Sequence, residues 1–369
     1  MATSEKAPML PTRAQQPPAR TPLLQRLRQP RTIIALTLGA FLVTTLIVLS
    51  VQAVRKTSTT SAPIVSTDYP VDTEGFQRVV TFDMSAQAGS APNCIPNVRR
   101  ALTTVRELGQ TAAGRKELAA IFRLCDANGL QTPEDIEGLA LSALGAYGSL
   151  AMGNYPYPSS YMTSGESFLP AYPVRAACEF LRPDFAADDR AALLAAFRDS
   201  VGVFYNASQT ETCYFPTAPP ANVTAIDIAG NFWGYLECSE LYMPMTSDSV
   251  HDVFPPERLN MTDHDAACVA QWGVHVRPGY AHMEYGGLKA LRAASNIVFS
   301  NGDYDPWSAT GVLETLSDSV VFVPVAGGAH HLDLFFSHPL DPPAVTQARA
   351  VEKQHIRRWI DEFYAAKRA

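Results

Sequence analysis

Two stretches near the end of the chain combine an apolar run with a polar loop. Residues 295–312 (SNIVFSNGDYDPWSATGV) and 320–334 (VVFVPVAGGAHHLDL) each begin with apolar, β-branched residues and continue into a glycine-bearing loop. This pattern predicts two short buried strands. The first loop carries Asp305 and the second His330. Because polar groups gather at the carboxyl ends of the strands in open α/β sheets, we expect these side chains to meet.

The middle of the chain has a helical pattern instead. From Pro96 onward, apolar residues recur every three or four positions, and alanine-rich segments at 134–150 and 186–204 predict two further helices. Thr132 is a good N-cap for the first of these, because Pro133 follows it and the acidic Asp135 lies three residues on. The sequence therefore predicts a helical subdomain ahead of the two strands.

Two further segments have patterns of their own. Residues 79–84 (VVTFDM) suggest a brief extended segment. From about Pro343 the chain predicts a final amphipathic helix, whose apolar face we expect to pack on the sheet. That face contains Ile356, Trp359, Ile360 and Phe363.

The N-terminal region contains an uncharged apolar run over residues 32–54, about the ~20 residues that a helix needs to cross a bilayer. Residues 1–31 hold six basic residues against one acidic residue and predict a disordered cytoplasmic tail. A type II single-pass membrane protein with an extracytoplasmic body is the expected topology. A cleaved signal peptide is the alternative, although the basic lead is long for one.

Composition and charge narrow the range of partners. The 369 residues are 47% hydrophobic and carry a formal net charge of −7, which supports a folded core and argues against nucleic-acid binding. No zinc-type cysteine–histidine spacing occurs, and we expect neither metal nor cofactor. Six cysteines and three glycosylation sequons, at Asn206, Asn222 and Asn260, all follow the apolar run. Both features are typical of the secretory pathway, at the cell surface, in a lysosome or in a vacuole.

Asp305 and His330 have the chemistry of a hydrolase acid–base pair. An acid on Nδ1 fixes the tautomer of a catalytic histidine and leaves Nε2 free to accept a proton from a nucleophile. The order Asp then His is also the order that α/β-hydrolases use after the nucleophile. On the residues alone, His330 is equally compatible with a structural histidine at a strand end, and Asp305 with a turn residue.

The sequences of the two loops resemble those of one peptidase family. SNGDYDPWSATGV and GAHHLDL are similar to the C-terminal signature of the lysosomal prolyl carboxypeptidase and dipeptidyl peptidase II family of serine exopeptidases. The resemblance implies that Asp305 is the catalytic acid and His330 the base. Similar segments, among them LAMGNYPYPSSY at Leu150 and CSELYMPM at Cys238, extend the resemblance from about Ser61 to the end.

The same resemblance implies further roles. Trp307 and Met243 would line an apolar pocket for proline, although both also suit plain core packing. The family pairing would imply three disulfides, which the sequence alone does not choose from 15 connectivities. These pairs are Cys94–Cys178, Cys125–Cys213 and Cys238–Cys268.

The sequence departs from the family at the nucleophile. A Gly-x-Ser-x-Gly elbow should precede SAPI at residues 61–64, but the chain contains no such motif. Ser167 and Ser300 each have a glycine on one side only, and both lie after this position. Loss of the nucleophile from a triad enzyme lowers activity on the order of 10⁶-fold, so we expect this chain alone to be inactive.

The expected fold is the C-terminal part of an α/β-hydrolase with an inserted helical, disulfide-bearing cap and an N-terminal transmembrane helix. The expected division is tail 1–31, membrane helix 32–54, linker and start of the hydrolase 55–91, cap 92–240 and hydrolase 241–369. Three hypotheses follow: a truncated product of a complete peptidase, a membrane-tethered pseudoenzyme that binds peptides or a protein partner, or a half-enzyme completed by another chain. A homodimer is compatible with each, and the sequence does not separate carboxypeptidase from dipeptidyl peptidase action.

Overall fold

The computed structural model describes residues 73–126, 128–215, 232–258 and 260–368. The predicted tail, the predicted membrane helix, the SAPI segment and the sequon at Asn222 lie outside these residues. Among the helices that are described, none combines the length and the apolar character needed to cross a bilayer.

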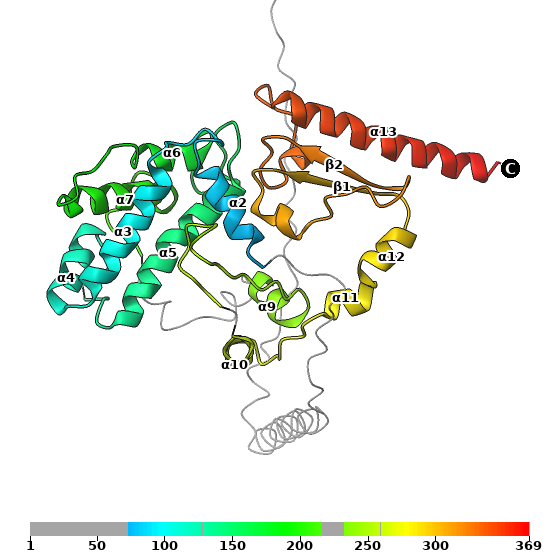
Figure 1. The fold of residues 1–369 in the computed structure, drawn as a ribbon. Helices are drawn as coiled ribbons and strands as arrows, with labels where there is room; N and C mark the ends of the chain where they lie inside the picture. Colours follow the sequence, from blue (N-terminus) through cyan, green and yellow to red (C-terminus); the bar gives the residue numbers. More distant parts are fainter. Residues whose placement is uncertain (1–72, 127, 216–231, 259, 369) are drawn as a thin grey trace, which may run out of the picture. The chain divides into compact units, whose positions relative to one another are not determined.

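The first half of the described chain is helical, as its periodicity predicts (Figure 1). Its largest hydrophobic core includes Val98, Leu102 and Val105, all on one face of the second helix. The helices are α2 (Gly75–Asp83), α3 (Cys94–Gly109), α4 (Ala112–Ile121), α5 (Pro133–Met152), α6 (Pro173–Glu179) and α7 (Arg190–Tyr205). The predicted helices at 134–150 and 186–204 correspond to α5 and α7.

Helix α5 begins where the sequence predicts. The hydroxyl oxygen of Thr132 accepts the N–H of Asp135, and the carboxylate of Asp135 accepts the N–H of Thr132 at 2.7 Å, which completes a capping box. Inside the core, Tyr147 on α5 and Ser200 on α7 share a buried hydrogen bond of 2.6 Å between their hydroxyls. Both helices are therefore fixed by polar contacts as well as by apolar packing.

Three disulfides cross-link the described chain, and they are the pairs that the family resemblance implies. Cys94–Cys178 joins α3 to α6 across 84 positions of sequence. Cys125–Cys213 spans a similar separation of 88 positions. Cys238–Cys268 joins α9 (Phe232–Ser239) to α10 (Met261–Trp272). Each bond is expected to stabilise the fold by roughly 2–4 kcal/mol.

The two predicted strands form a parallel pair. Strand β1 (Ile297–Gly302) runs beside β2 (Val320–Val325), with Phe299 opposite Phe322. The short helices α11 (Tyr280–Tyr285), α12 (Gly287–Ala293), η2 (Tyr161–Thr163), η3 (Pro306–Thr310) and η4 (Leu332–Leu334) complete the described elements, together with α13 (Pro343–Ala366). A second core joins β2 and α13 to Tyr155 and Tyr157, which follow α5.

Two expectations about individual segments are wrong. Residues 79–84 are not extended: Gly75–Asp83 is helical, because Gln77, Val80 and Asp83 are buried at a spacing of three residues, and Met84 follows on the same face. The expected apolar face of α13 does not pack on the sheet either. Ile356, Ile360 and Phe363 are 49%, 44% and 55% exposed, and α13 packs through Val345 and Ala348 in its first turns instead.

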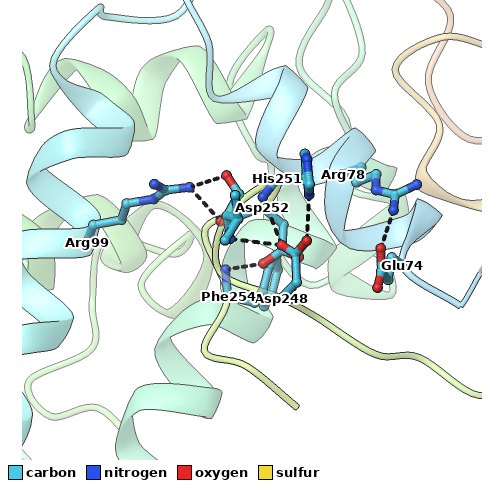
Figure 2. Close-up of polar contacts among 8 residues, drawn as sticks. Glu74, Arg78, Arg99, Asp248, His251, Asp252 and Phe254 are labelled. Atoms are coloured by element: carbon cyan, nitrogen blue, oxygen red, sulfur yellow. Dashed lines mark hydrogen bonds and ion pairs between the residues drawn. The ribbon is translucent and has the colours of Figure 1, made fainter. Parts of the chain in front are cut away.

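A loop between α9 and α10 is held against α3 (Figure 2). A guanidinium nitrogen of Arg99 donates to the carbonyl oxygens of Asp252 and Val250 at 2.7 and 3.2 Å. The buried carboxylate of Asp252 accepts the backbone N–H groups of Asp248 and Phe254 at 3.0 and 2.8 Å. These contacts fix the path of residues 248–254.

The capping box offers a test of the helical packing. Replacing Thr132 by alanine removes the acceptor for the Asp135 N–H and should lower the free energy of unfolding by about 1 kcal/mol. Urea denaturation followed by circular dichroism measures the change. Thr103→Ala on the exposed face of α3 is the control and should leave the midpoint nearly unchanged. Equal losses in both variants would contradict a role for the cap.

Candidate active site

The structure brings Asp305 and His330 together at the ends of the parallel strands. Nδ1 of His330 lies 3.1 and 3.0 Å from the two carboxylate oxygens of Asp305. The side chains are only 10% exposed for Asp305 and 20% for His330. Such a contact fixes the proton on Nδ1 and leaves Nε2 as the acceptor.

The loop that carries Asp305 is locked to the loop that carries His330. The Tyr304 N–H donates to the carbonyl of Gly328 at 3.0 Å, and the Gly327 N–H donates to the carboxylate of Asp303 at 2.6 Å. A Cβ on Gly302 would lie 1.9 Å from the Gly328 oxygen, so only glycine permits this approach. Asp305 itself caps η3 by accepting the Trp307 N–H at 2.9 Å.

The main chain of His330 is held from the other side by the end of α5. Its N–H donates to the Met152 carbonyl at 3.2 Å, and its carbonyl accepts the Tyr155 hydroxyl at 2.6 Å. The neighbouring His331 has a left-handed backbone, and its ring centroid lies 3.6 Å from that of His330. Burial, and then the charge of His330, lower the pKa of His331. His331 is therefore disposed to be neutral beside the pair.

A cavity of about 790 Å³ lies beside the acid–histidine pair and is lined by both predicted pocket residues, Trp307 and Met243. The Trp307 ring packs edge-on against Phe76 and Trp233, with centroids 5.1 and 5.3 Å away, and lies 6.4 Å from the His330 ring. Trp307 therefore links the lining of the cavity to the candidate catalytic histidine.

Part of the cavity lining is polar. Its charged and polar residues include Glu237, Glu257, Arg258, Asn260, Asp263 and His264. Asn260, a predicted glycosylation site, also caps α10 by accepting the Thr262 N–H at 3.1 Å. The second described sequon residue, Asn206, lies at the end of α7 and donates to the Tyr214 hydroxyl at 3.3 Å. Glycosylation of these residues stays a prediction.

For several residues of the site, the sequence does not indicate the role that the structure gives them. Trp233 and Phe76 lie in segments without a recognisable motif, and only folding brings them to Trp307. Tyr155 belongs to an aromatic stretch that suggests a loop, yet its hydroxyl binds the main chain of His330. Within the described residues, no hydroxyl is hydrogen-bonded to Nε2 of His330, which is the position a nucleophile would take.

A group of polar residues forms hydrogen bonds to the loop that follows His330. The carboxylate of Asp333 accepts the Ser300 hydroxyl of β1 at 2.7 Å, which ties this loop to the first strand. Arg349 on α13 donates to the carbonyls of Asp333 and Leu332 at 2.6 and 2.9 Å. Burial, followed by the charge of Asp333, raises the pKa of Glu352 on α13 to about 7.

An Asp–His pair at the carboxyl ends of two parallel strands, beside an apolar cavity, is the arrangement of serine hydrolases with an α/β-hydrolase-like fold. The chain belongs to the serine carboxypeptidase S28 family, whose model matches residues 41–352. This confirms the resemblance that the two loop motifs carry.

The relatives of this chain carry the names of carboxypeptidases or of carboxypeptidase-like proteins. A lysosomal Pro-X carboxypeptidase of Bos taurus is 33% identical over 304 residues, which cover 82% of this chain and 58% of the relative. The Homo sapiens protein of the same name is 34% identical over 305 residues, with the same coverage. A Caenorhabditis elegans "prolyl carboxy peptidase like protein 5" is 31% identical over 267 residues, 69% of this chain and 51% of the relative. The chain thus spans little more than half of their length.

The pKa of Glu352 predicts a pH dependence of stability. The native protein keeps a proton on Glu352 that the unfolded chain releases near pH ~4, so this contribution is full at lower pH and is lost as the pH rises to about 7. Glu352→Gln should flatten the decline of the urea midpoint over this window. Glu362→Gln, on the exposed part of α13, should leave the slope as it is. An unchanged slope in Glu352→Gln would contradict the assignment.

Proposed function

We propose that this chain supplies the acid and the base of a serine exopeptidase site. The observation that carries the proposal is the contact of both Asp305 carboxylate oxygens with Nδ1 of His330, next to an apolar cavity. His330 would act as general base through Nε2, and Asp305 would orient it and stabilise the imidazolium.

The proposed substrates are peptides with proline or a small residue next to the scissile bond. Trp307 and Met243 would contact that residue, because an aromatic and a thioether surface favour a compact apolar ring over a charged side chain. The names of the relatives, Pro-X carboxypeptidases, support this substrate class. The body of the protein would act in an extracytoplasmic compartment of the secretory pathway, tethered by residues 32–54.

The chemistry of such a site has two stages. A serine hydroxyl attacks the peptide carbonyl while its proton passes to Nε2 of His330, and the resulting imidazolium then gives this proton to the departing amine. An acyl-serine ester remains, and water hydrolyses it with His330 again acting as base. Every proton transfer passes through Nε2, the ring atom that Asp305 leaves free.

The serine that this chemistry needs is the element we propose to be missing from the chain. No Gly-x-Ser-x-Gly sequence occurs in its 369 residues. A longer product of the same gene, or a second chain, would then provide the nucleophile. A membrane-tethered protein that binds peptides without cleaving them is the alternative, and the presence of a cavity together with the absent motif supports it.

A fluorophosphonate probe tests for the nucleophile. We expect no stoichiometric labelling of the purified chain and no hydrolysis of proline-containing peptides, because no serine is activated by Nε2 of His330. A serine peptidase of known active-site content serves as the positive control for the probe. Labelling of one serine per chain, located by mass spectrometry, would overturn the proposal of a missing nucleophile.

Peptide binding tests the cavity independently of cleavage. Short peptides that contain proline should bind, and Trp307→Ala should weaken binding on the order of 10- to 30-fold, because an aromatic anchor of a buried pocket is removed. Titration calorimetry measures the dissociation constant. Trp359→Ala on α13, which does not line the cavity, is the matched control. Equal affinities of the two variants would contradict the assignment of the pocket.

A further inference from the structure

Two buried polar side chains meet behind the candidate active site. Asp83 is the last residue of α2, and Asn154 lies two residues after the end of α5; both are fully buried. Nδ2 of Asn154 donates to Oδ2 of Asp83 at 3.1 Å. The remaining oxygen of each side chain, Oδ1 in both cases, has no partner among the described residues. Two unsatisfied buried acceptors in one contact are costly.

One proton would satisfy both oxygens. A carboxylate and an amide oxygen are both acceptors and cannot bond to each other, whereas a protonated carboxyl group can donate to the amide oxygen. We propose that Asp83 is protonated in the folded protein and forms a two-hydrogen-bond ring with Asn154, and that this pair positions the segment that holds His330. The two bonds are Asn154 Nδ2–H to Oδ2 of Asp83 and Asp83 Oδ1–H to Oδ1 of Asn154.

The charges around Asp83 favour the protonated form. Two carboxylates act on it from the loop after β1, Asp303 and Asp305, against the single guanidinium of Arg175 on α6. Arg175 is already engaged, since it donates to the Ala88 carbonyl at 2.8 Å and to the Tyr304 hydroxyl at 3.1 Å. Burial is the largest cause and raises the pKa of Asp83 well above its usual range, although the hydrogen bond from Asn154 acts in the opposite direction.

Helices η3 and α5, which pack on α2, bring no positive charge that would stabilise an ionised Asp83. Helix η3 (PWSAT) contains no ionisable residue. The acidic residues of α5, Glu134, Asp135 and Glu137, lie at its first turns. These are separated from Asn154 by 17 or more residues, roughly 25 Å along a helix. Arg175 is therefore the one positive group that the described elements bring to bear on Asp83.

The pair lies where it can position His330. Asn154 lies in sequence between Met152, whose carbonyl accepts the His330 N–H, and Tyr155, whose hydroxyl donates to the His330 carbonyl. A neutral Asp83 also places no second negative charge near Asp305. This positioning role rests on the proposed function, whereas the proton on Asp83 does not.

The proton can be detected directly. Infrared spectra of the full chain at pH about 8, where Glu352 is largely ionised, should retain a protonated carboxyl band. The band should shift when aspartate is labelled with ¹³C and should disappear in Asp83→Asn. A spectrum without such a band in the wild-type protein would overturn the proposal, and this measurement requires no variant to fold.

The pH dependence of stability tests the Asp83–Asn154 pair further. The unfolded chain releases the proton near pH ~4, so the contribution of Asp83 is full below that pH and is lost as the pH rises through its raised pKa. Asp83→Asn, whose amide can make both bonds, should raise the urea midpoint at pH about 8, whereas exposed Asp188→Asn should not. A lower midpoint in Asp83→Asn would show that the wild-type group is an ionised carboxylate.

Positioning is read from the ¹⁵N signals of His330, which report the protonation of Nδ1 and Nε2. They should be preserved in Asp83→Asn and changed in Asp83→Ala, which loses both hydrogen bonds. Identical His330 signals in a folded Asp83→Ala would refute the positioning role. Absence of peptide binding would count against the peptidase proposal alone, because the infrared band does not depend on it.

Discussion

The backbone N–H and the backbone carbonyl of His330 are both hydrogen-bonded to the segment at the end of α5. Its N–H and carbonyl bind Met152 and Tyr155, so the imidazole is placed by the helical part of the molecule and not by its own strand alone. The opposite loop is fixed by the close backbone approach of Gly302 and Gly328. The Asp305–His330 contact depends on both constraints, because a shift of either loop would separate Nδ1 from the carboxylate.

The helical region and the strand-bearing region both contribute residues to the site, and these residues pack against one another. Tyr155 and Tyr157 follow α5 in sequence but pack in the core of β2 and α13. Trp307 follows β1, yet it packs on Phe76 of α2 and on Trp233 of α9. The division at residue 240 that the sequence suggests remains a prediction, and the cavity draws its lining from both sides of it.

Local signals in the sequence were sufficient to predict α5, α7 and the two strands, and to predict that Asp305 and His330 meet. The Thr132 cap, the spacing in α3 and the two β-branched runs act over a few residues, and the order Asp305 then His330 follows from strand ends that share one edge. The errors arose where tertiary packing decides. Residues 79–84 are rich in β-branched and aromatic residues, but α2 buries one helical face of them; α13 shows an apolar face that the described chain does not cover. The Asp83–Asn154 contact joins residues 71 positions apart and has no local pattern.

The Cys238–Cys268 bond has a consequence for the relation between binding and catalysis. The residues of the cavity wall from Tyr242 to His264 all lie inside the 30-residue loop that this bond closes, whereas Asp305 and His330 lie outside it. Arg99 holds the same loop against α3 through backbone carbonyls. Part of the proposed substrate pocket is thus built on a covalently closed loop, whereas Trp307 and the Asp305–His330 pair lie outside this loop. Reduction of this bond would release that part of the cavity wall without cutting any covalent link to Asp305 or His330.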